Sequence, residues 1–359
     1  MARIEVGAGA GAYPVEVGRG LREEIPARLQ ELSGGAGCLV IADSNTAGLV
    51  GAYLAAALRA RIHVVPAGER SKSFAELERA VEAALDAGLD RRGVIVAVGG
   101  GVVGDLAGVV AATYMRGVRL VHVPTTLLAM VDSAIGGKAA IDVPRAKNLV
   151  GAFKPPAVVF VDPDLLRTLP EREYRSGLAE VAKYSMISDE HLFDTLLAEA
   201  ERVLHRELDL LTTVIERCCA IKAGVVTRDE HEAGERAILN YGHTVGHALE
   251  AATGYGPLTH GEAVAVGMTA AAEIGAAAGV TPAVVVERQG ALLDALHLPR
   301  TAPGVATAGD VLALLAHDKK AAAGQPRWVL IEAVGRATWG HSVPVPVVEA
   351  AVAHALEAG

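Results

Sequence analysis

The sequence predicts an α/β N-terminal domain with a parallel, Rossmann-like sheet, followed by an all-α C-terminal domain. In the first half of the chain, short runs of aliphatic and β-branched residues alternate with Ala- and Leu-rich segments of helical periodicity. This alternation is typical of a parallel sheet covered by helices on both faces. Later in the chain helical periodicity dominates, so we place the two domains at residues 1–170 and 171–359.

The elements follow in order along the chain. Two β-rich runs, 4–6 and 14–17, are expected to form a peripheral hairpin on the sheet. We then predict strands at 38–43, 62–66, 94–98, 120–124 and 158–162, and helices at 47–59, 73–87 and 101–115. In the C-terminal domain we predict helices at 172–186, 189–202, 206–227, 232–252, 261–279, 284–295, 308–316 and 346–357, with a hairpin at 327–331 and 336–339. We expect a hinge near 168–172 and a binding cleft between the packed domains.

The composition excludes several classes of protein. A net charge of −9 without a basic stripe argues against a general nucleic-acid binder, although a few local cations could still bind an anionic substrate. Cys38, Cys218 and Cys219 form no CxxC pair, so we expect neither a disulfide framework nor a cysteine zinc site. The N-terminus lacks the apolar core of a signal peptide, and Glu273 interrupts the apolar stretch 263–280. We therefore expect a cytoplasmic protein that does not span a membrane.

A glycine-rich turn follows the strand at 94–98 and leads from Gly99, Gly100 and Gly101 into a helix that carries Asp105. Such a turn allows the backbone to approach a pyrophosphate, which the free N–H groups of the helix can bind. No acidic residue lies about 20 residues further on, where a standard dinucleotide-binding protein would have one. Acidic candidates instead follow earlier strands, in Asp43-Ser-Asn45 and Glu69-Arg-Ser-Lys72. A merely tight βα turn is the alternative interpretation.

Polar residues also follow the next strand, at Thr125 and Thr126. Further on, Asp132 precedes a Gly-Gly turn that ends in Lys138, and Lys147-Asn148 come about ten residues later. This pattern favours a polar loop that wraps an anion, although threonine and aspartate often only cap helices.

The segment 236–247 contains four polar residues at helical spacing. On one α-helix, Arg236, Asn240, His243 and His247 would lie within a narrow stripe, where an ordinary amphipathic helix would have Leu or Val. His260 lies nearby in the sequence. We therefore predict a metal and anion site on this face.

Glu180 can complete a set of metal ligands. A catalytic zinc site often takes two histidines and a glutamate and leaves one position open for substrate, and Glu180, His243 and His260 could supply that set. His243 and His247 as an HxxxH pair are the competing assignment. The spacing of Glu180 and Lys183 also allows a simple ion pair on a helix.

Together these motifs resemble the 3-dehydroquinate synthase family of sugar phosphate cyclases. The resemblance extends from Asp43 to the Asp318-Lys319-Lys320 segment. Its most specific elements are GGGVVGD at 99–105, PTTLLAMVDSAIGGK at 124–138, KNLVGAF at 147–153, GLAEVAKY at 177–184 and LNYGHTVGHALE at 239–250. It implies a nucleotide-binding α/β domain joined to a helical metal-binding domain, as in the iron-dependent polyol dehydrogenases.

The resemblance implies a role for each matching position. NAD would be bound by Asp43, Asn45, Glu69, Lys72, Gly100, Gly101, Val102, Asp105, Thr125, Thr126, Leu128, Lys138, Lys147 and Thr168. Zinc or cobalt would be bound by Glu180, His243 and His260, which leaves His247 for the substrate. The substrate phosphate would contact Lys138, Asn148, Asn240, His247, a lysine of the pair Lys319 and Lys320, and Arg116 of a neighbouring subunit in a homodimer. The substrate carboxylate would pair with Lys222 and Arg236, and its hydroxyls would contact Asp132, Lys183 and Glu232.

The implied activity is that of a lyase in the shikimate pathway. It converts 3-deoxy-D-arabino-heptulosonate 7-phosphate to 3-dehydroquinate and phosphate, and NAD is oxidant and reductant within one cycle. An amino-dehydroquinate synthase of antibiotic pathways would have almost identical residues and stays an alternative. The carboxylate pair Lys222 and Arg236 argues against cyclases that make inosose or valiolone rings. A metal-dependent polyol dehydrogenase would need no phosphate pocket, so it is less well supported.

Overall fold

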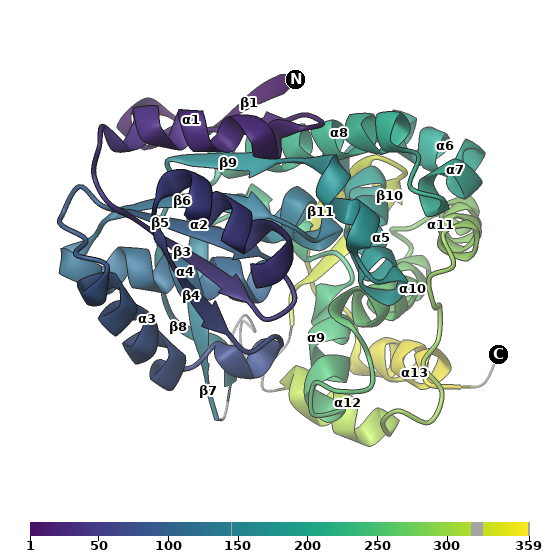
Figure 1. Cartoon of the computed structure of the whole chain (residues 1–359). Coiled ribbons are helices and arrows are strands. Elements are labelled where there is room, and N and C mark those ends of the chain that lie inside the picture. Colours follow the sequence, from purple (N-terminus) through teal and green to yellow (C-terminus); the bar gives the residue numbers. More distant parts are fainter. Residues whose placement is uncertain (145, 317–325, 358–359) are drawn as a thin grey trace. The chain divides into compact units, whose positions relative to one another are not determined.

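The computed structural model describes residues 1–144, 146–316 and 326–357, which form two compact units (Figure 1). Unit 1 comprises Met1–Leu169 together with Lys222–Thr227. Unit 2 comprises Pro170–Ile221 and Arg228–Gly359. Each unit is described by itself below.

A seven-stranded sheet forms the centre of unit 1. Its strands, in chain order, are β1 (Ala2–Val6), β2 (Tyr13–Val17), β3 (Cys38–Asp43), β4 (Arg61–Val65), β5 (Val94–Gly99), β6 (Arg119–Pro124) and β9 (Val158–Val161). The spatial order is β1-β2-β9-β6-β5-β3-β4, and all neighbours are parallel except β1 and β2. Every residue of β5 is buried, as expected for a central strand covered on both faces. The predicted peripheral hairpin is confirmed as β1 and β2.

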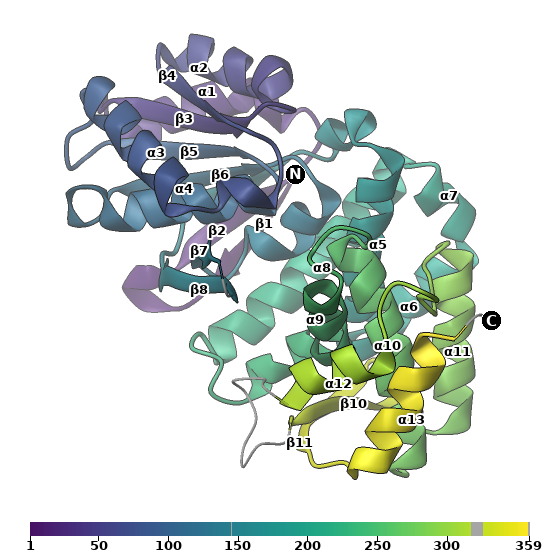
Figure 2. The ribbon, with the colours of Figure 1, turned by 90° about the horizontal axis from the view of Figure 1, so that it is seen from below.

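Helices cover both faces of this sheet. They are α1 (Leu21–Ser33), α2 (Ala52–Leu58), α3 (Phe74–Asp86) and α4 (Gly101–Thr113). Figure 2 shows α1 and α2 on one face and α3 and α4 on the other. Leu39 and Ile95 of the sheet pack with Ala80 of α3 and Val110 of α4 in one buried cluster. The predicted α/β class is therefore confirmed for this part of the chain.

Two strands that were not predicted follow the Gly-Gly turn that ends in Lys138. Strands β7 (Lys138–Val143) and β8 (Ala146–Phe153) form an antiparallel pair that is separate from the seven-stranded sheet. Ala139 and Ile141 of this pair are buried against Leu106 and Val109 of α4. Apolar residues are the majority in both strands, but they do not alternate regularly with polar ones, so the sequence pattern did not predict strands here.

Unit 2 is mainly helical, as predicted. Its helices are α5 (Glu171–Ser188), α6 (Glu190–Ala198), α7 (Ala200–Leu204), most of α8 (Leu208–Arg228), α9 (His243–Ala252), α10 (His260–Ala277), α11 (Ala283–Ala295), α12 (Ala308–Ala316) and α13 (Val345–Ala355). The predicted hairpin is confirmed as β10 (Trp328–Ala333) and β11 (Arg336–His341). Trp328 packs with Leu249 of α9, Val266 of α10 and Val352 of α13 in the core.

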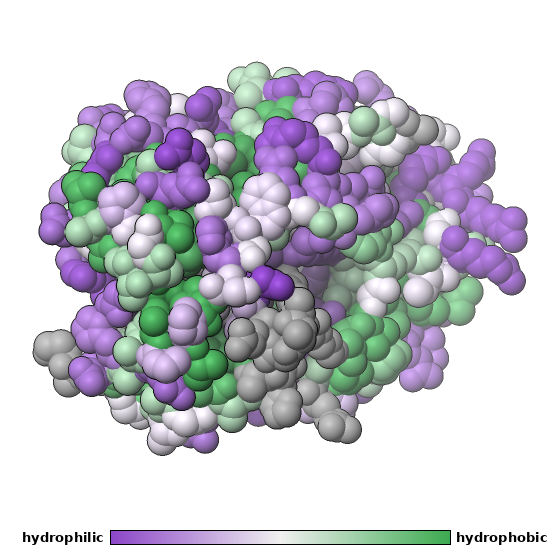
Figure 3. All heavy atoms as spheres, turned by 180° about the vertical axis from the view of Figure 1, so that it is seen from behind, coloured by the Kyte–Doolittle hydropathy of each residue, from purple (hydrophilic) through white to green (hydrophobic). Residues whose placement is uncertain are grey.

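Among the described residues, no helix is long and apolar enough to cross a membrane. On the face drawn in Figure 3, hydrophilic areas alternate with hydrophobic ones.

Candidate active site

Three helices of unit 2 bring Glu180, His243 and His260 together. Glu180 lies in α5 and is fully buried, whereas His243 and His260 are the first residues of α9 and α10. Glu180 Oε1 lies 3.3 Å from Nε2 of His243 and 3.2 Å from Nε2 of His260. One candidate ligand atom from each residue lies within 4.8 Å of the others. The three donors therefore face a common point, as the ligands of a metal ion do.

The other ring nitrogen of each histidine has its own acceptor. Nδ1 of His243 lies 3.1 Å from the Tyr241 carbonyl oxygen, and Nδ1 of His260 lies 3.2 Å from Glu250 Oε2. These oxygens can only accept, so they favour the hydrogen on Nδ1 and leave the Nε2 lone pair for a metal. Histidine ligands of metals usually have such a partner. The arrangement fits a divalent ion of the zinc type.

The charges around Glu180 also suit a cation. Burial alone would raise the pKa of the Glu180 carboxyl, but Lys183 and the two imidazoles hold this pKa well below its usual value. The Lys183 ammonium lies 2.5 Å from Glu180 Oε2 as an ion pair, although that oxygen has no partner in hydrogen-bonding geometry within the described ranges. Burial disfavours charge on His260, yet its contacts with Glu180 and Glu250 raise its pKa to about 10. A divalent ion bound to Nε2 would have to displace the proton that this pKa represents.

The prediction of one continuous helix over 232–252 is wrong. Residues Glu235–Asn240 form a 3₁₀ segment, Tyr241 has a non-helical backbone, and α9 begins at His243. Between them Gly242 has a left-handed φ of 77°, and a Cβ on it would lie 2.6 Å from Met268 Cγ and 2.8 Å from the Val264 oxygen. The chain thus turns where α9 packs against α10. The four polar residues therefore do not share one helical stripe.

His243 and His247 do share a face of α9, with ring centroids 5.2 Å apart. His247 is exposed and forms a second group with Glu250 and His260, whose candidate ligand atoms also lie within 4.8 Å of one another. The buried Glu180 carboxylate and the two Nε2 atoms that face it favour the first group as the metal site.

Three further predicted substrate residues of unit 2 lie in or just before the 3₁₀ segment: Arg236 and Asn240 belong to it, and Glu232 precedes it. Asn240 Nδ2 donates to Glu232 Oε1 at 2.7 Å. Arg236 is buried, and its guanidinium donates to the Glu230 carbonyl oxygen. The structure thus brings Asn240 and Glu232 together.

Unit 1 brings together five of the predicted cofactor and substrate residues. Lys72 Nζ lies 2.7 Å from Asp105 Oδ2 and also donates to Asn148 Oδ1. Glu69 Oε1 lies 3.5 Å from Lys72 Nζ and 3.4 Å from Lys147 Nζ. These residues come from the segment after β4, from α4 and from β8, which the sequence alone does not connect.

Negative charge exceeds positive charge in this cluster. Asp142 Oδ1 is also 4.0 Å from Lys72 Nζ, so one ammonium faces three carboxylates. Burial lowers the pKa of Lys72, but these carboxylates outweigh it and raise that pKa. Burial raises the pKa of Asp105 to about 6, although the Lys72 ammonium opposes the shift. Burial thus dominates the pKa of Asp105, whereas the neighbouring carboxylates dominate the pKa of Lys72.

The glycine turn after β5 forms a cradle at the N-terminus of α4. A Cβ on Gly100 would lie 3.1 Å from Thr126 Cγ2, and one on Gly101 would lie 3.1 Å from Ser133 Oγ. The Thr125 and Ser133 hydroxyl oxygens are buried and have no hydrogen-bond partner within the described part of the chain. Buried hydroxyls usually have one, so these oxygens and the helix N-terminus are suited to bind a pyrophosphate or a ribose.

Other predicted cofactor and substrate residues also belong to unit 1. Asp43 ends β3, and its Oδ1 accepts from the N–H groups of Asn45 at 3.0 Å and Thr46 at 2.9 Å. Lys222 Nζ lies 2.7 Å from Asp132 Oδ1. Val102 lies in the first turn of α4, Leu128 follows the threonine pair, Lys138 begins β7, and Thr168 ends the 3₁₀ segment Pro163–Thr168. Lys319 and Lys320 lie outside the described residues.

Three predicted site residues have an unusual backbone conformation. Arg116, Asn148 and Glu232 have φ values of 66°, 52° and 58°. A positive φ is uncommon outside glycine, and such conformations cluster at functional sites.

The chain matches known families along most of its length. Residues 62–176 match the 3-dehydroquinate synthase N-terminal family, and residues 177–321 match the C-terminal family. The chain belongs to the 3-dehydroquinate synthase family. It is 48% identical over 291 residues to a 3-dehydroquinate synthase of Synechocystis sp., covering 80% of each chain. It is 44% identical to that of Acidithiobacillus ferrooxidans over 363 residues, covering 100% of this chain and 98% of the relative.

Solved structures of sugar phosphate cyclases have the same fold. A 2-deoxy-scyllo-inosose synthase complexed with carbaglucose-6-phosphate, NAD⁺ and Co²⁺ has a TM-score of 0.90 at 28% identity, covering 99% of this chain and 100% of the other. The 2-epi-5-epi-valiolone synthase of Streptomyces hygroscopicus, with NAD⁺ and Zn²⁺ bound, has a TM-score of 0.86 at 31% identity, covering 95% of each chain. The predicted family and fold are thus confirmed.

Two residues that lie beside the predicted site residues were not predicted from the sequence. Glu250, which accepts from His260 Nδ1, lies two helical turns after His243 on the same face of α9. That spacing is a signal that could have identified it. Ser133 lies in the motif at 124–138, but the sequence does not show that its hydroxyl lies next to Gly101 of the glycine turn.

Proposed function

We propose that this chain is a 3-dehydroquinate synthase. It converts 3-deoxy-D-arabino-heptulosonate 7-phosphate to 3-dehydroquinate and phosphate, using NAD and a divalent metal ion, in the shikimate pathway. The observation that carries this proposal is the convergence of Glu180 Oε1 with Nε2 of His243 and His260, in a chain that is 44% identical to a 3-dehydroquinate synthase over its full length.

The proposed metal ligands are Glu180, His243 and His260. When bound, the divalent ion polarises a substrate oxygen, and NAD accepts a hydride and returns it in the same cycle. Glu250 and the Tyr241 carbonyl keep the two imidazoles in the tautomer that leaves Nε2 available. The Lys183 ammonium, 2.5 Å from Glu180 Oε2, is placed to bind a substrate hydroxyl next to the metal.

The proposed NAD site lies at the carboxyl edge of the sheet in unit 1. The N-terminus of α4 and the Thr125 hydroxyl bind the cofactor phosphates and ribose, and Asp43 and Glu69 bind ribose hydroxyls. The Lys72 ammonium offsets the carboxylate of Asp105. Because the cofactor is regenerated in each cycle, this site has to hold NAD firmly rather than exchange it.

The predicted substrate contacts are part of the proposal. The phosphate is bound by Lys138, Asn148, Asn240, His247 and Arg116, the carboxylate by Lys222 and Arg236, and the hydroxyls by Asp132, Lys183 and Glu232. Arginine and lysine side chains bind these anionic groups by charge-assisted hydrogen bonds. Arg116 acts from the partner subunit of a homodimer. The homodimer and a cytoplasmic location stay predictions.

The amino-dehydroquinate synthase alternative differs only in the substrate. The two activities are separated by supplying the heptulosonate phosphate and its amino analogue in parallel and comparing kcat/KM. A higher kcat/KM for the amino analogue would reassign the chain.

The first experiment measures phosphate release from 3-deoxy-D-arabino-heptulosonate 7-phosphate with traces of NAD and zinc, before and after a chelator. The proposal expects release that requires metal and leaves no net NADH. Formation of NADH from simple polyols without phosphate release would place the chain among the dehydrogenases instead.

A variant pair tests the ligand set directly. His260→Ala is expected to lose bound metal and turnover together, whereas His205→Ala, at an exposed position in unit 2, is expected to retain both. A His260→Ala protein with full metal content and activity would refute the ligand assignment.

A further inference from the structure

Helices α5 and α10 meet along a row of three contacts that ends at the proposed metal centre. Arg172, Ser176 and Glu180 are four residues apart on α5, so they lie on one face of that helix. They contact, in the same order, Glu262, Gly261 and His260 at the start of α10. The row thus leads from the helix surface to a proposed metal ligand.

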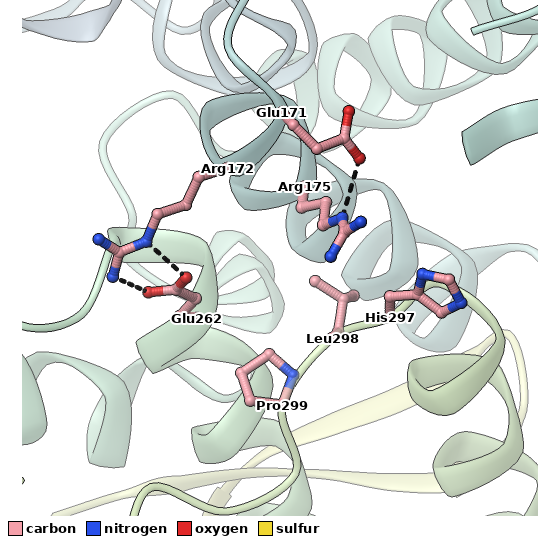
Figure 4. A pocket seen from close by; sticks show the side chains of 7 residues that line it. All are labelled: Glu171, Arg172, Arg175, Glu262, His297, Leu298 and Pro299. Carbon is pink, nitrogen blue, oxygen red and sulfur yellow. Dashed lines mark hydrogen bonds and ion pairs between the residues drawn. The ribbon is translucent and has the colours of Figure 1, made fainter. Parts of the chain in front are cut away.

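The outer contact is a bidentate ion pair (Figure 4). Arg172 Nε lies 2.8 Å from Glu262 Oε1, and Nη2 lies 2.7 Å from Oε2 and 2.6 Å from the Pro257 carbonyl oxygen. Glu262 Oε2 also accepts from the Thr259 N–H at 2.8 Å, and Thr259 Oγ1 accepts from the Glu262 N–H at 3.3 Å. One guanidinium therefore holds both the chain that enters α10 and the capping box that starts it.

The middle contact joins the two backbones. The Gly261 N–H donates to Ser176 Oγ at 3.0 Å, and a Cβ on Gly261 would lie 2.0 Å from the Ser176 carbonyl oxygen. At this distance the first turn of α10 cannot move closer to α5. It can still pivot about the contact, and the ion pair between Arg172 and Glu262 opposes that pivot because it is one residue further along α10.

We propose that Arg172 is a positioning residue of the metal centre, acting through Glu262 on the direction in which His260 presents Nε2 to Glu180. This inference rests on the proposed ligand set. Metal ligands have to be within about 0.2 Å of their ideal distances, so a small pivot of the first turn is enough to weaken binding. The fork of an arginine fixes an orientation, which a single point charge does not.

The guanidinium of this ion pair is largely exposed to solvent, whereas the Glu262 side chain is 21% exposed. The Arg172 side chain is 56% exposed, and the pair borders an open pocket of about 270 Å³. Exposed ion pairs contribute little to the free energy of unfolding. We therefore expect Arg172 to affect metal affinity more than stability.

The test measures zinc affinity of the metal-stripped full-length protein by competition with a chelator. Arg172→Met and Glu262→Gln are each expected to raise the dissociation constant about tenfold, as loss of an outer partner of a ligand does. The double variant is expected to be no worse than either single one, because both changes break the same contact. The affinity for NAD and the melting temperature of the metal-free protein are expected to change little.

Arg288→Met is the matched control. Arg288 joins α11 to α6 through Glu190 at 2.7 Å and Asp194 at 2.9 Å, in the same unit but without contact to a proposed ligand. It is expected to leave zinc affinity unchanged. Arg172→Lys keeps the charge but loses the fork, so it is expected to restore only part of the affinity and provides the same test if Arg172→Met does not fold.

Wild-type zinc affinity in Arg172→Met would overturn the inference, and so would an equal loss in Arg288→Met. Additive losses in the double variant would also overturn it, because Arg172 would then not act through Glu262. His260→Ala distinguishes failure of the proposed ligand set from failure of the proposed role of Arg172. If His260→Ala retains zinc, the ligand set is wrong. If it loses zinc while Arg172→Met does not, only the role of Arg172 fails.

Discussion

The contact between α9 and α10 gives the sharpest prediction, for Gly267→Ala. A Cβ on Gly267 would lie 2.0 Å from the Gly242 carbonyl oxygen and 2.9 Å from the Gly246 nitrogen. Real Cβ atoms essentially never come closer than 3.0 Å to another heavy atom, so the two backbones have to separate by at least about 1 Å. Neither partner is a flexible side chain that could move aside.

The separation acts directly on the proposed metal ligands. His243 follows Gly242, whereas His260 belongs to the helix that carries Gly267. A shift of about 1 Å is several times the tolerance of about 0.2 Å for a metal–ligand distance. Because loss of an outer partner alone weakens binding about 10- to 100-fold, we expect a displaced ligand to weaken zinc binding by more than about 100-fold. Overpacking should also lower the free energy of unfolding by about 1–3 kcal/mol.

The assay combines chelator competition for zinc with urea unfolding of the metal-free protein. Gly309→Ala is the control, since Gly309 lies in α12 and, within the described ranges, the nearest atom outside its own helix backbone and chain neighbours is Thr307 Oγ1, 3.8 Å from the added Cβ. It is expected to keep zinc affinity and to gain about 0.5–1 kcal/mol, because alanine is the better helix former. Wild-type zinc affinity in Gly267→Ala would refute the reasoning, whatever its stability.

Three further predictions concern the other groups of the site. Thr125→Val should leave the free energy of unfolding of the NAD-free protein unchanged or raise it by about 1 kcal/mol, because it removes a buried hydroxyl without a hydrogen-bond partner among the described residues. It should also weaken NAD binding, measured by calorimetry. Lower stability with unchanged NAD affinity would contradict this prediction. Burial raises the pKa of Asp105 to about 6 against the effect of Lys72, so the folded protein favours the protonated carboxyl. The free energy of unfolding that this provides is complete at a pH below the ordinary pKa of aspartate, and it is lost as the pH rises through the pKa in the folded protein. Asp105→Asn in the NAD-free protein should thus gain stability relative to wild type between about pH 4 and pH 7, and a difference that does not vary with pH in urea unfolding would argue against it. Arg236→Met should raise KM for the heptulosonate phosphate about 10- to 100-fold, because a charge-assisted hydrogen bond to the substrate carboxylate is lost, and it should leave NAD affinity unchanged. An unaltered KM would contradict the proposal that Arg236 binds the substrate carboxylate.

Most of the fold could be predicted because its strands are simple. The predicted strand 38–43 agrees to the residue with β3, since a parallel strand whose four inner residues are buried appears in the sequence as one aliphatic run. The hairpin of β7 and β8 could not be predicted in this way, because its core contacts are made by the buried Ala139 and Ile141 and the partly buried Val150, which do not form one aliphatic run. Its pairing depends on contact with α4, which lies far from it in the sequence.

The candidate site was predicted partly for a wrong reason. A single helix over 232–252 suggested the polar stripe, yet a 3₁₀ segment ends before Gly242, which has a left-handed backbone and no room for a Cβ beside Met268 of another helix. Local spacing contains no trace of that contact. His243 and His247 remain on one face because they belong to the same helix after the break.

The break explains how two histidines from different helices reach one carboxylate. His243 and His260 each begin a helix, so the backbone before each of them is free to turn, and the helix after each is held by close backbone contact. Those contacts are made by glycines, Gly267 against Gly242 and Gly261 against Ser176. A backbone contact has no rotamers with which to absorb an error, unlike a contact between two long side chains. The distances among the proposed ligands are therefore set by these glycine positions more than by the apolar core. A substitution that adds one methyl group at one of these glycines should weaken metal binding more than a substitution that removes several methyl groups from the apolar core.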